Sequence, residues 1–331
     1  MTPSRFPSVA VVVPAHQAVG QLGLCLDGLL AAGFAKDEIL VVDDGSRDGT
    51  GAVASAAGIR VLRNDTAQRP ARARNAGVAA TQSDIVVFVD ADVVLHPGAS
   101  DRIRAFFRDE PGYGALIGSY DSAPASPRWV SRYRNLLHHY VHQNSNTEAS
   151  TFWTGIGAVQ RAAYESAGGL DPAWENIEDV ELGLRLVEQG HRIRLDPALQ
   201  GTHLKDWTLQ SMWRTDWKGR AVPWSRLLRE RRTQTGDLNL SLGHQISGAA
   251  IAAFAGLILL TPLLPFLVWP ALAAFAVFVA SNARFLRFLA QVGGPGFAAA
   301  ALFYHAAHYM AALTGYLEVA VKAVLPHRAA R

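Results

Sequence analysis

Two aspartates that lie one residue apart, Asp90 and Asp92, are the residues of this chain best suited to chemistry. They interrupt the apolar stretch FVDADVVL, and both charges need a partner because an unpaired buried carboxylate is costly. A divalent cation would provide one, since Mg²⁺ is often held by one or two carboxylates together with phosphate oxygens. By itself, the pattern fits a solvated turn at the end of a strand equally well.

A second acidic pair, Asp43 and Asp44, follows an apolar run in the stretch VVDDGSRDGT. A carboxylate at this position can accept hydrogen bonds from a base N–H and from ribose hydroxyls. The alternative is a turn that leads into a helix, because Ser46, Asp48 and Thr50 are residue types that cap helix N-termini.

The elements that must position these pairs alternate between short apolar runs and helical patterns. Strands are predicted at 9–13, 39–42, 59–63 and 84–89, and helices at 19–34, 49–57, 70–80, 126–142 and 175–190. Nearly all-apolar strands alternating with helices are typical of an open, mostly parallel α/β sheet with helices on both faces. Ligands of such sheets bind beyond the carboxyl ends of the strands, where both acidic pairs and the turn at 14–17 fall.

The last part of the chain has a different composition. No residue between Ile246 and Ala283 is charged, and three prolines interrupt this stretch near its middle. Because about 20 apolar residues suffice to cross a bilayer, we expect a hairpin of two membrane helices at roughly 246–265 and 270–290. The alternative is a buried helical bundle of a soluble protein.

A third apolar segment, 297–325, either spans the membrane or lies in its interface, and we favour a span. The segment before the hairpin, 204–241, is rich in tryptophan and arginine, as expected at a membrane interface. We therefore predict a catalytic domain over 1–203, an interfacial segment over 204–241 and membrane-associated helices over 242–331.

The catalytic domain is expected on the cytoplasmic side of the cell (inner) membrane. Arg284 and Arg287 fall at the end of the second predicted span, in agreement with the positive-inside rule. The apolar run 9–13 is too short for a signal peptide. The single cysteine, Cys25, excludes an intrachain disulfide and fits core packing.

Five stretches of the sequence resemble family 2 glycosyltransferases in their order and approximate spacing. They are VVVPAHQ, VVDDGSRDGT, RARNAG, VFVDADV and GGLDPAWENIEDVELGLRL. The resemblance covers about residues 9–232, and 203–224 resembles members with C-terminal membrane helices. It implies the GT-A fold and inverting transfer from a nucleotide-sugar donor, UDP-linked, with Mg²⁺ or Mn²⁺ as cofactor.

The resemblance also implies roles for individual residues. The residues that it implies contact the nucleotide sugar are Pro14, Ala15, His16, Asp43, Asp44, Arg72, Arg74, Asp90 and Ala91. Among them, Asp43 is a weaker candidate than Asp44, and Arg72 is a helper. The metal would be held by Asp92 directly, with His203 and Asp90 assisting, although His203 also fits a polar loop.

For the acceptor side, the resemblance implies that Asp179, next to Glu178, is the general base. Trp153 and Gly155 would line the acceptor site, but Trp153 fits a core position equally well. A metal site at the histidines of LLHHYVHQ is disfavoured because no carboxylate motif lies near them. The stretch QSMWR departs from the Gln-x-x-Arg-Trp motif of processive synthases, which favours transfer of a single sugar.

The expected acceptor is lipid-linked or otherwise bound at the membrane interface. A polyprenyl phosphate is the alternative acceptor, and its ionised oxygen would need no base. Two other classes are kept as alternatives: a nucleotidyltransferase, which releases pyrophosphate, and a non-catalytic nucleotide-binding scaffold. A Rossmann dehydrogenase is disfavoured because no Gly-x-Gly-x-x-Gly follows the first strand. We expect no nucleic-acid partner and predict no particular oligomeric state.

Overall fold

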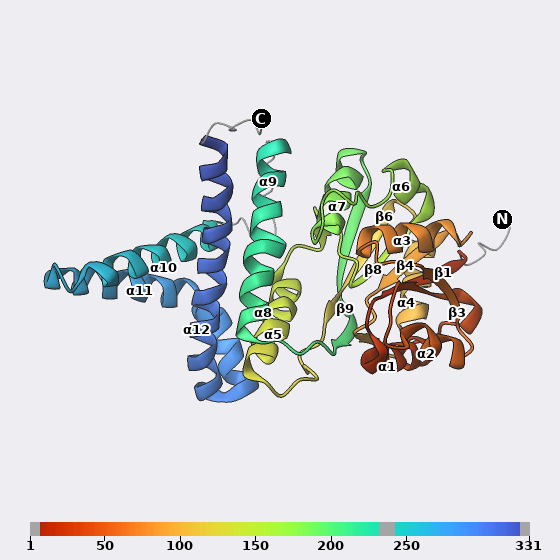
Figure 1. Cartoon of the computed structure of the whole chain (residues 1–331), viewed down its shortest axis with the longest axis horizontal. Coiled ribbons are helices and arrows are strands. Elements are labelled where there is room, and N and C mark those ends of the chain that lie inside the picture. The colour runs from red at the N-terminus through yellow and green to blue at the C-terminus, as the bar shows by residue number, and fades with distance from the viewer. Residues whose placement is uncertain (1–6, 232–241, 325–331) are drawn as a thin grey trace. The chain divides into compact units, whose positions relative to one another are not determined.

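The computed structural model of the protein describes residues 7–231 and 242–324 (Figure 1). The chain divides into two compact units, one of Met1–Ser126 with His138–Lys205 and the other of Pro127–Leu137 with Asp206–Arg331. The first unit contains the sheet, and the second contains the apolar helices. Residues 127–137 belong to the second unit, although they lie far before its other residues in the sequence.

The first unit is built on a sheet that has nine strands within the described residues. The strands are β1 (Val9–Ala15), β2 (Ile39–Asp44), β3 (Arg60–Asn64), β4 (Ile85–Val89), β5 (Val93–Leu95), β6 (Tyr113–Tyr120), β7 (Glu148–Ala149), β8 (Ile156–Gln160) and β9 (Arg192–His203). Their order is β3-β2-β1-β4-β8-β6-β9-β5, and β7 pairs with β9. The strands predicted in the first part of the chain are thus present.

The sheet is mixed rather than mostly parallel. Strands β1 to β4 pair in parallel, as predicted from their alternation with helices. Strand β8 then lies antiparallel between β4 and β6, and β5 and β7 lie antiparallel to β9. Regular strand–helix alternation stops after β4, and antiparallel pairing requires no crossover helix, which explains the difference.

Helices cover both faces of the sheet, because side chains of each strand alternate between two apolar cores. Val11 and Val13 of β1 face one core, whereas Val12 faces the other. The first core is covered by α1 (Val19–Ala31), α2 (Thr50–Ala56) and α4 (Ala99–Asp109). The second is covered by α3 (Pro70–Ala79), α6 (Arg161–Ser166) and α7 (Glu178–Glu188). A short 3₁₀ turn, η1 (Lys36–Glu38), precedes β2.

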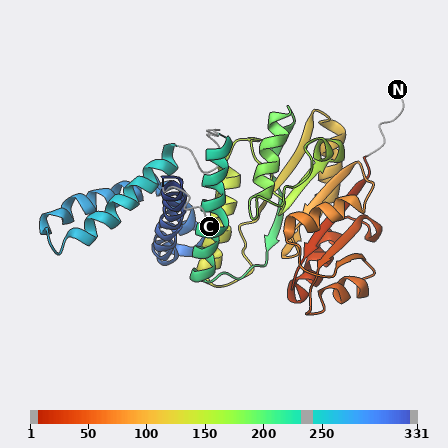
Figure 2. The same cartoon turned by 45° about the horizontal axis from the view of Figure 1, so that its top comes forward.

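The second unit is helical. Its elements are the first part of α5 (Trp129–Asn144), α8 (Leu209–Arg214), η2 (Thr215–Ala221), α9 (Val222–Arg231), α10 (Leu242–Leu260), η3 (Pro265–Leu267), α11 (Val268–Ser281) and α12 (Ala283–Val324). Helices α8, η2 and α9 follow one another without a break, and we call them together the basic run, Leu209–Arg231. Helices α10 and α11 form a hairpin, which projects away from α12 (Figure 2).

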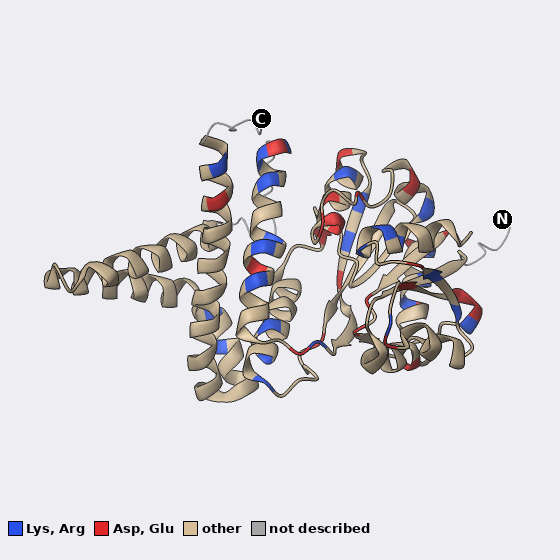
Figure 3. Ribbon diagram, in the orientation of Figure 1, with Lys and Arg blue, Asp and Glu red and all other residues tan. Residues whose placement is uncertain are grey.

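The hairpin agrees with the predicted turn but is shorter than predicted. Its second arm ends at Ser281, and α12 begins at Ala283 and contains Gly294 with a φ of 83°. Among the residues that the structure describes, two helices, α10 and α12, are long and apolar enough to cross a membrane by length and composition. The hairpin carries no charged side chain, whereas the basic run carries charges along its length (Figure 3).

Candidate active site

The ends of β1 and β2 are joined by hydrogen bonds that shape the predicted nucleotide side of the site. His16 donates from Nδ1 to the carbonyl oxygen of Asp44 at 2.8 Å. The backbone N–H of Gln17 donates to Ser46 Oγ at 3.0 Å, and that of Arg47 donates to Gln17 Oε1 at 2.8 Å. The turn after β1, which follows Pro14 and Ala15 at the end of the strand, is therefore held against the turn after β2.

The carboxylate of Asp43 is fully buried and is used by the protein itself. Its Oδ1 accepts the backbone N–H of Ser46 at 2.9 Å, and its Oδ2 lies 3.1 Å from Arg63 Nη1. Asp43 thus stabilises the turn after β2.

Asp44 organises the loop that leads into α3. Its carboxylate accepts hydrogen bonds from Asn64 Nδ2 at 2.7 Å and from the backbone N–H groups of Gln68 and Arg69 at 2.9 Å. The side chain is also nearly buried. Asp44 therefore connects the end of β2, where His16 is bound, to the segment just before the arginines of RARNAG.

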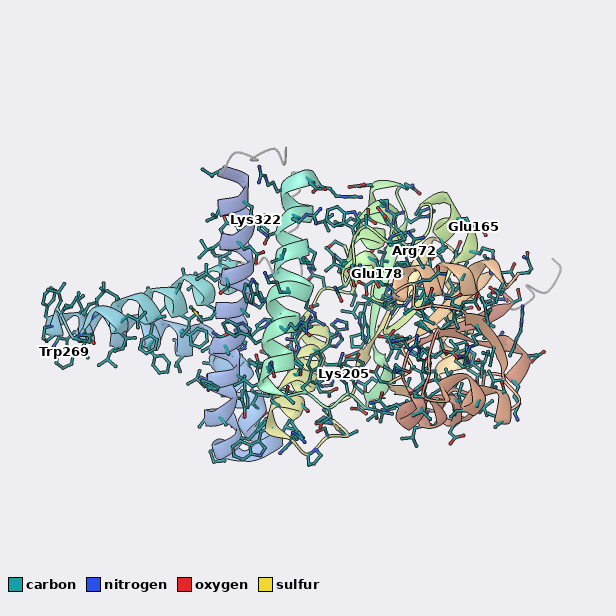
Figure 4. The ribbon with its side chains drawn as sticks, in the orientation of Figure 1. Arg72, Glu165, Glu178, Lys205, Trp269 and Lys322 are labelled. Carbon is teal, nitrogen blue, oxygen red and sulfur yellow. The ribbon has the colours of Figure 1, made fainter. Side chains whose placement is uncertain are left out.

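The side chain of Arg74 bridges two of the predicted site residues. Its Nη2 lies 2.6 Å from Asp90 Oδ1, and its Nη1 lies 2.8 Å from Glu178 Oε1. Arg74 and Glu178 are almost fully buried, whereas the side chain of Asp90 keeps 31% of its surface exposed. The bridge joins the loop after β4 to the start of α7. Arg72, by contrast, lies exposed on α3 (Figure 4).

Helix α7 brings Asp179 to the segment that contains the predicted acceptor residues. A Cβ at Gly183 would lie 2.0 Å from the backbone nitrogen of Phe152, so only glycine permits this approach. Asp179 Oδ2 accepts hydrogen bonds from Thr154 N at 3.1 Å and Thr154 Oγ1 at 3.3 Å. The carbonyl of Gly155 in turn accepts the backbone N–H of Asp90 at 3.3 Å. The acceptor segment therefore contacts the carboxylate of Asp179 and the backbone of Asp90.

Asp92 lies beside His203 at the end of β9. The distance between Asp92 Oδ2 and His203 Nε2 is 3.5 Å, and the backbone N–H of Leu204 donates to the carbonyl of Asp92 at 2.8 Å. The ring of His203 stacks on Tyr120 with centroids 4.2 Å apart, which fixes its plane. The buried Ala91 separates Asp92 from Asp90.

The pair formed by Asp92 and His203 suits a divalent cation. Two neighbouring ligands of an octahedral Mg²⁺ with bonds of about 2.1 Å lie roughly 3 Å apart, close to the separation found here. In the part of the chain that the structure describes, no three His, Cys, Asp or Glu side chains are grouped as metal ligands. A cation here would therefore need oxygen atoms from the diphosphate as well.

The histidines of α5 have structural contacts. His139 and His142 donate from Nδ1 to the carbonyl oxygens of Tyr120 and Gly118, each at 2.8 Å. Burial lowers the pKa of His142 to about 4, so its ring is neutral at physiological pH. Trp153 packs in the same cluster, with its ring 4.4 Å from His138, and a Cβ at Gly155 would lie 2.4 Å from that indole.

The carboxylates of the site differ in the direction in which their pKa values are shifted. Burial raises the pKa of Asp90 above its usual value, although Arg74 opposes this, and Asp92 and Asp179 raise it further. Burial likewise raises the pKa of Glu178. Burial would also raise the pKa of Asp92, but the hydrogen bond and charge of His203, together with Lys205, hold it below its usual value.

Several contacts of the site had no signal in the sequence. Thr154 donates to Asp179, and Tyr120 stacks on His203. Lys205 lowers the pKa of Asp92 by its charge. Each of these residues is remote from its partner along the chain. No spacing rule connects such residues, so only the folded chain reveals them.

Comparisons with known proteins agree with the geometry. Residues 10–167 match the family model described as glycosyl transferase family 2. The pre-mycofactocin glycosyltransferase of Mycobacterium tuberculosis is 28% identical over 214 residues, which cover 60% of this chain and 44% of that protein. "Probable glycosyltransferase YdaM" of Bacillus subtilis is 25% identical over 226 residues, which cover 63% of this chain and 54% of that protein. The chain thus spans about half the length of these curated relatives.

A solved structure shares the fold. The mannosyltransferase PcManGT from Pyrobaculum calidifontis, in complex with GDP-Man and Mn²⁺, is similar with a TM-score of 0.60 and 18% identity. The similarity covers 95% of this chain and 88% of that chain. The GT-A-type fold predicted from the sequence is therefore confirmed, with a mixed sheet.

Proposed function

Since the chain belongs to glycosyltransferase family 2 through residues 10–167, we propose that it is a membrane-anchored, metal-dependent, inverting glycosyltransferase. It moves one sugar from a UDP-linked donor to a lipid-linked or other interface-bound acceptor. A GDP-linked donor is the runner-up, because the similar solved structure was obtained with GDP-Man.

The observation that supports this proposal best is that one arginine and one loop hold three acidic residues, Asp90, Glu178 and Asp179, close to one another. Arg74 binds Asp90 and Glu178, and the 154–155 segment binds Asp179 and the backbone of Asp90. A group of carboxylates at the carboxyl edge of a sheet, two of them with a raised pKa, is the pattern expected of a catalytic site.

Asp92 and His203 would hold Mg²⁺ or Mn²⁺, with Asp90 assisting. The cation supplies Lewis-acid stabilisation of the leaving diphosphate. Asp90, held by Arg74, would contact the ribose. Asp44 and His16, at the end of β2 and β1, would form the side of the site that receives the base, next to Pro14 and Ala15.

Asp179 would act as the general base. A hydroxyl acceptor loses its proton as it attacks, and a positioned carboxylate accepts that proton. Thr154 holds one carboxylate oxygen of Asp179 and so orients the group. With one base and no opposing nucleophile, the sugar is transferred in a single displacement, which inverts the anomeric carbon.

The acceptor is proposed to be membrane-bound because the second unit contains helices that are long and apolar enough for a bilayer. We propose that the protein lies on the cytoplasmic face of the inner membrane, and the basic residues of the basic run and the two arginines at the start of α12 support this side.

The proposal is tested by a thermal-shift screen of UDP, GDP, dTDP and their sugars with Mn²⁺ or Mg²⁺, because a ligand of the folded state raises its apparent stability. Donors that bind are then incubated with membrane lipid, and the released nucleotide is identified. UDP release that requires the cation supports the proposal. Pyrophosphate release would identify a nucleotidyltransferase instead, and the absence of any metal-dependent turnover of a nucleotide sugar would leave only a binding scaffold.

Two acceptor types separate the remaining alternatives. The wild-type protein and Asp179→Asn are each assayed with a hydroxyl-bearing lipid acceptor and with a polyprenyl phosphate. If Asp179→Asn loses transfer to the hydroxyl-bearing acceptor but keeps transfer to the polyprenyl phosphate, the result supports Asp179 as the general base. Asp109→Asn is the matched control, because Asp109 is an exposed carboxylate paired only with its neighbour Arg108 in the salt bridges found.

A further inference from the structure

The turn of the α10–α11 hairpin is built for an apolar surrounding. The turn and the helix ends beside it bear strongly exposed apolar side chains, with Leu263 at 79%, Leu259 at 77% and Trp269 at 72%. Figure 4 shows Trp269 at the far end of the hairpin. An apolar surface of this kind in water would be unfavourable.

Most backbone N–H groups of the turn are also satisfied internally. The N–H groups of residues 261, 263, 264 and 267 all donate to carbonyl oxygens within the turn or the preceding helix, at 3.0 to 3.3 Å. Pro262 and Pro265 have no N–H to satisfy. The hydroxyl of Thr261 donates to the carbonyl of Ile258 at 2.7 Å. In hydrocarbon each unsatisfied group is costly, so these bonds are what a turn inside a bilayer requires.

The opposite end of the hairpin is polar. Ser247 and Ser281 lie 3.0 Å apart through their hydroxyl oxygens, and Asn282 donates to Ser247 Oγ at 3.0 Å. Two exposed arginines, Arg284 and Arg287, follow at the start of α12. Such side chains belong at the level of the headgroups.

The length of the arms limits how deep the turn can reach. From Ser247 to Leu260, and from Ser281 to Val268, each arm rises about 20 Å at ~1.5 Å per residue. The hydrocarbon core of a bilayer is about 30 Å thick. With the serines near the headgroups, the turn ends within the core and does not reach the other side.

Helix α12 runs across the hairpin rather than along it, as Figures 1 and 2 show, so the two cannot both lie along the membrane normal. Helix α12 packs on the basic run: Glu318 accepts from Trp217 Nε1 at 3.0 Å and pairs with Lys218 at 2.6 Å. His308 pairs with Asp216 at 2.9 Å. A spanning α12 would carry these charges into hydrocarbon, whereas the hairpin has none.

We propose that only the α10–α11 hairpin enters the bilayer, that its turn ends among the lipid acyl chains, and that α12 lies on the same membrane surface as the basic run. This topology rests on the membrane anchoring in the proposed function. It replaces the predicted spans by a single re-entrant hairpin. Exposed cationic side chains of the basic run, such as Arg214, Lys218 and Arg229, complement anionic headgroups.

The topology is tested by cysteine labelling in the full-length protein. The only native cysteine, Cys25, is buried, so the wild-type chain provides the background. Leu263→Cys, Lys322→Cys and the control Arg229→Cys are each expressed and exposed to a membrane-impermeant maleimide in sealed right-side-out and inverted vesicles. All three substitutions replace exposed side chains, and labelling in detergent verifies that each cysteine is reactive.

We expect Arg229→Cys and Lys322→Cys to be labelled from the same side only. Leu263→Cys should show no labelling in vesicles of either orientation and full labelling in detergent. Labelling of Leu263→Cys from the side opposite to Arg229→Cys would overturn the re-entrant hairpin but leave the proposed function intact. Labelling of Lys322→Cys from that opposite side would overturn the surface position of α12.

Labelling of Leu263→Cys from the same side as Arg229→Cys would overturn insertion of the hairpin. Extraction of the wild-type protein with alkaline carbonate then shows whether membrane anchoring fails as well. Sugar transfer is assayed separately in detergent, so failure of the topology and failure of the proposed activity are distinguishable.

Discussion

The guanidinium of Arg74 lies 2.6 Å from the carboxylate of Asp90, and this pair connects α3 to the loop after β4. The second arm of the guanidinium contacts Glu178 at 2.8 Å. Because the arginine is buried between two acids, it neutralises charge that would otherwise be costly in the core of the site. Arg74 is thus a positioning residue for Asp90, in addition to the role near the nucleotide that the sequence predicts.

Replacing Arg74 by Met should destabilise the first unit by about 3 kcal/mol, because it leaves Glu178 buried without a cation. The free energy of unfolding is measured by urea denaturation followed by tryptophan fluorescence. The control is Arg102→Met, which breaks the half-exposed pair with Asp196 and should cost less than about 1 kcal/mol. Equal effects of the two substitutions would contradict the special role of Arg74.

Replacing Asp92 by Ala should reduce sugar transfer at least ~100-fold, because it removes the proposed direct ligand of the cation. The far-UV circular dichroism and the thermal midpoint should change little, since Asp92 is half-buried and its backbone carbonyl still accepts from Leu204. Mn²⁺ binding, measured by electron paramagnetic resonance with the nucleoside diphosphate present, should weaken in parallel. Retained metal-dependent activity in this variant would refute the metal assignment.

Replacing Asp179 by Asn should lower kcat for a hydroxyl acceptor by roughly 10²–10⁴-fold, the usual contribution of a general base. The amide preserves the size of the side chain and can still accept from Thr154, so KM for the donor should stay close to the wild-type value. Steady-state kinetics with both substrates varied measures the two constants. An unchanged kcat would remove Asp179 from the mechanism.

The pH dependence should reveal the raised pKa of Asp90. If ionised Asp90 is required, activity should fall as pH decreases through this raised pKa, above the usual value of about 4 for aspartate. The contribution of Asp90 to the free energy of unfolding should change in the opposite direction and increase as pH decreases. A carboxyl that binds its proton more tightly in the folded state makes folding more favourable at low pH. This contribution is fully present below the unfolded pKa and is lost as pH rises through the raised folded pKa.

The kcat/KM profile and the urea midpoint are therefore compared over the same pH range. The charged groups that face Asp90 and affect its pKa are Arg74, Asp92 and Asp179. Asp90→Asn, which cannot titrate, should flatten the stability profile in this range. A profile of urea midpoints that is identical in the variant and the wild type would show that Asp90 does not titrate there.

Much of the fold could be predicted from the sequence alone. The strands and helices from Val9 to Val89 follow from apolar runs, helical periodicity and turn residues, all of which act within a few positions of each other. The acidic pairs Asp43–Asp44 and Asp90–Asp92 fall at strand ends for the same local reason. The charge-free hairpin and its proline-rich turn are equally local features.

Other features depended on the tertiary structure. The sequence cannot indicate that β8 enters the sheet antiparallel, because register depends on which distant strands meet. It also cannot indicate that Arg74 and Glu178, 104 residues apart, share a hydrogen bond, or that His203 lies beside Asp92.

The same holds for the second unit. Composition predicts a span at 297–325, and α12 is long and apolar enough for one, but only the tertiary structure shows that α12 pairs with charged side chains of the basic run. The sequence by itself determined which residue types are available and which short segments form helices or strands, because those depend on neighbouring residues. Only the tertiary structure decided which carboxylate meets which cation and which helices share a direction, because those energies arise between segments that folding brings together.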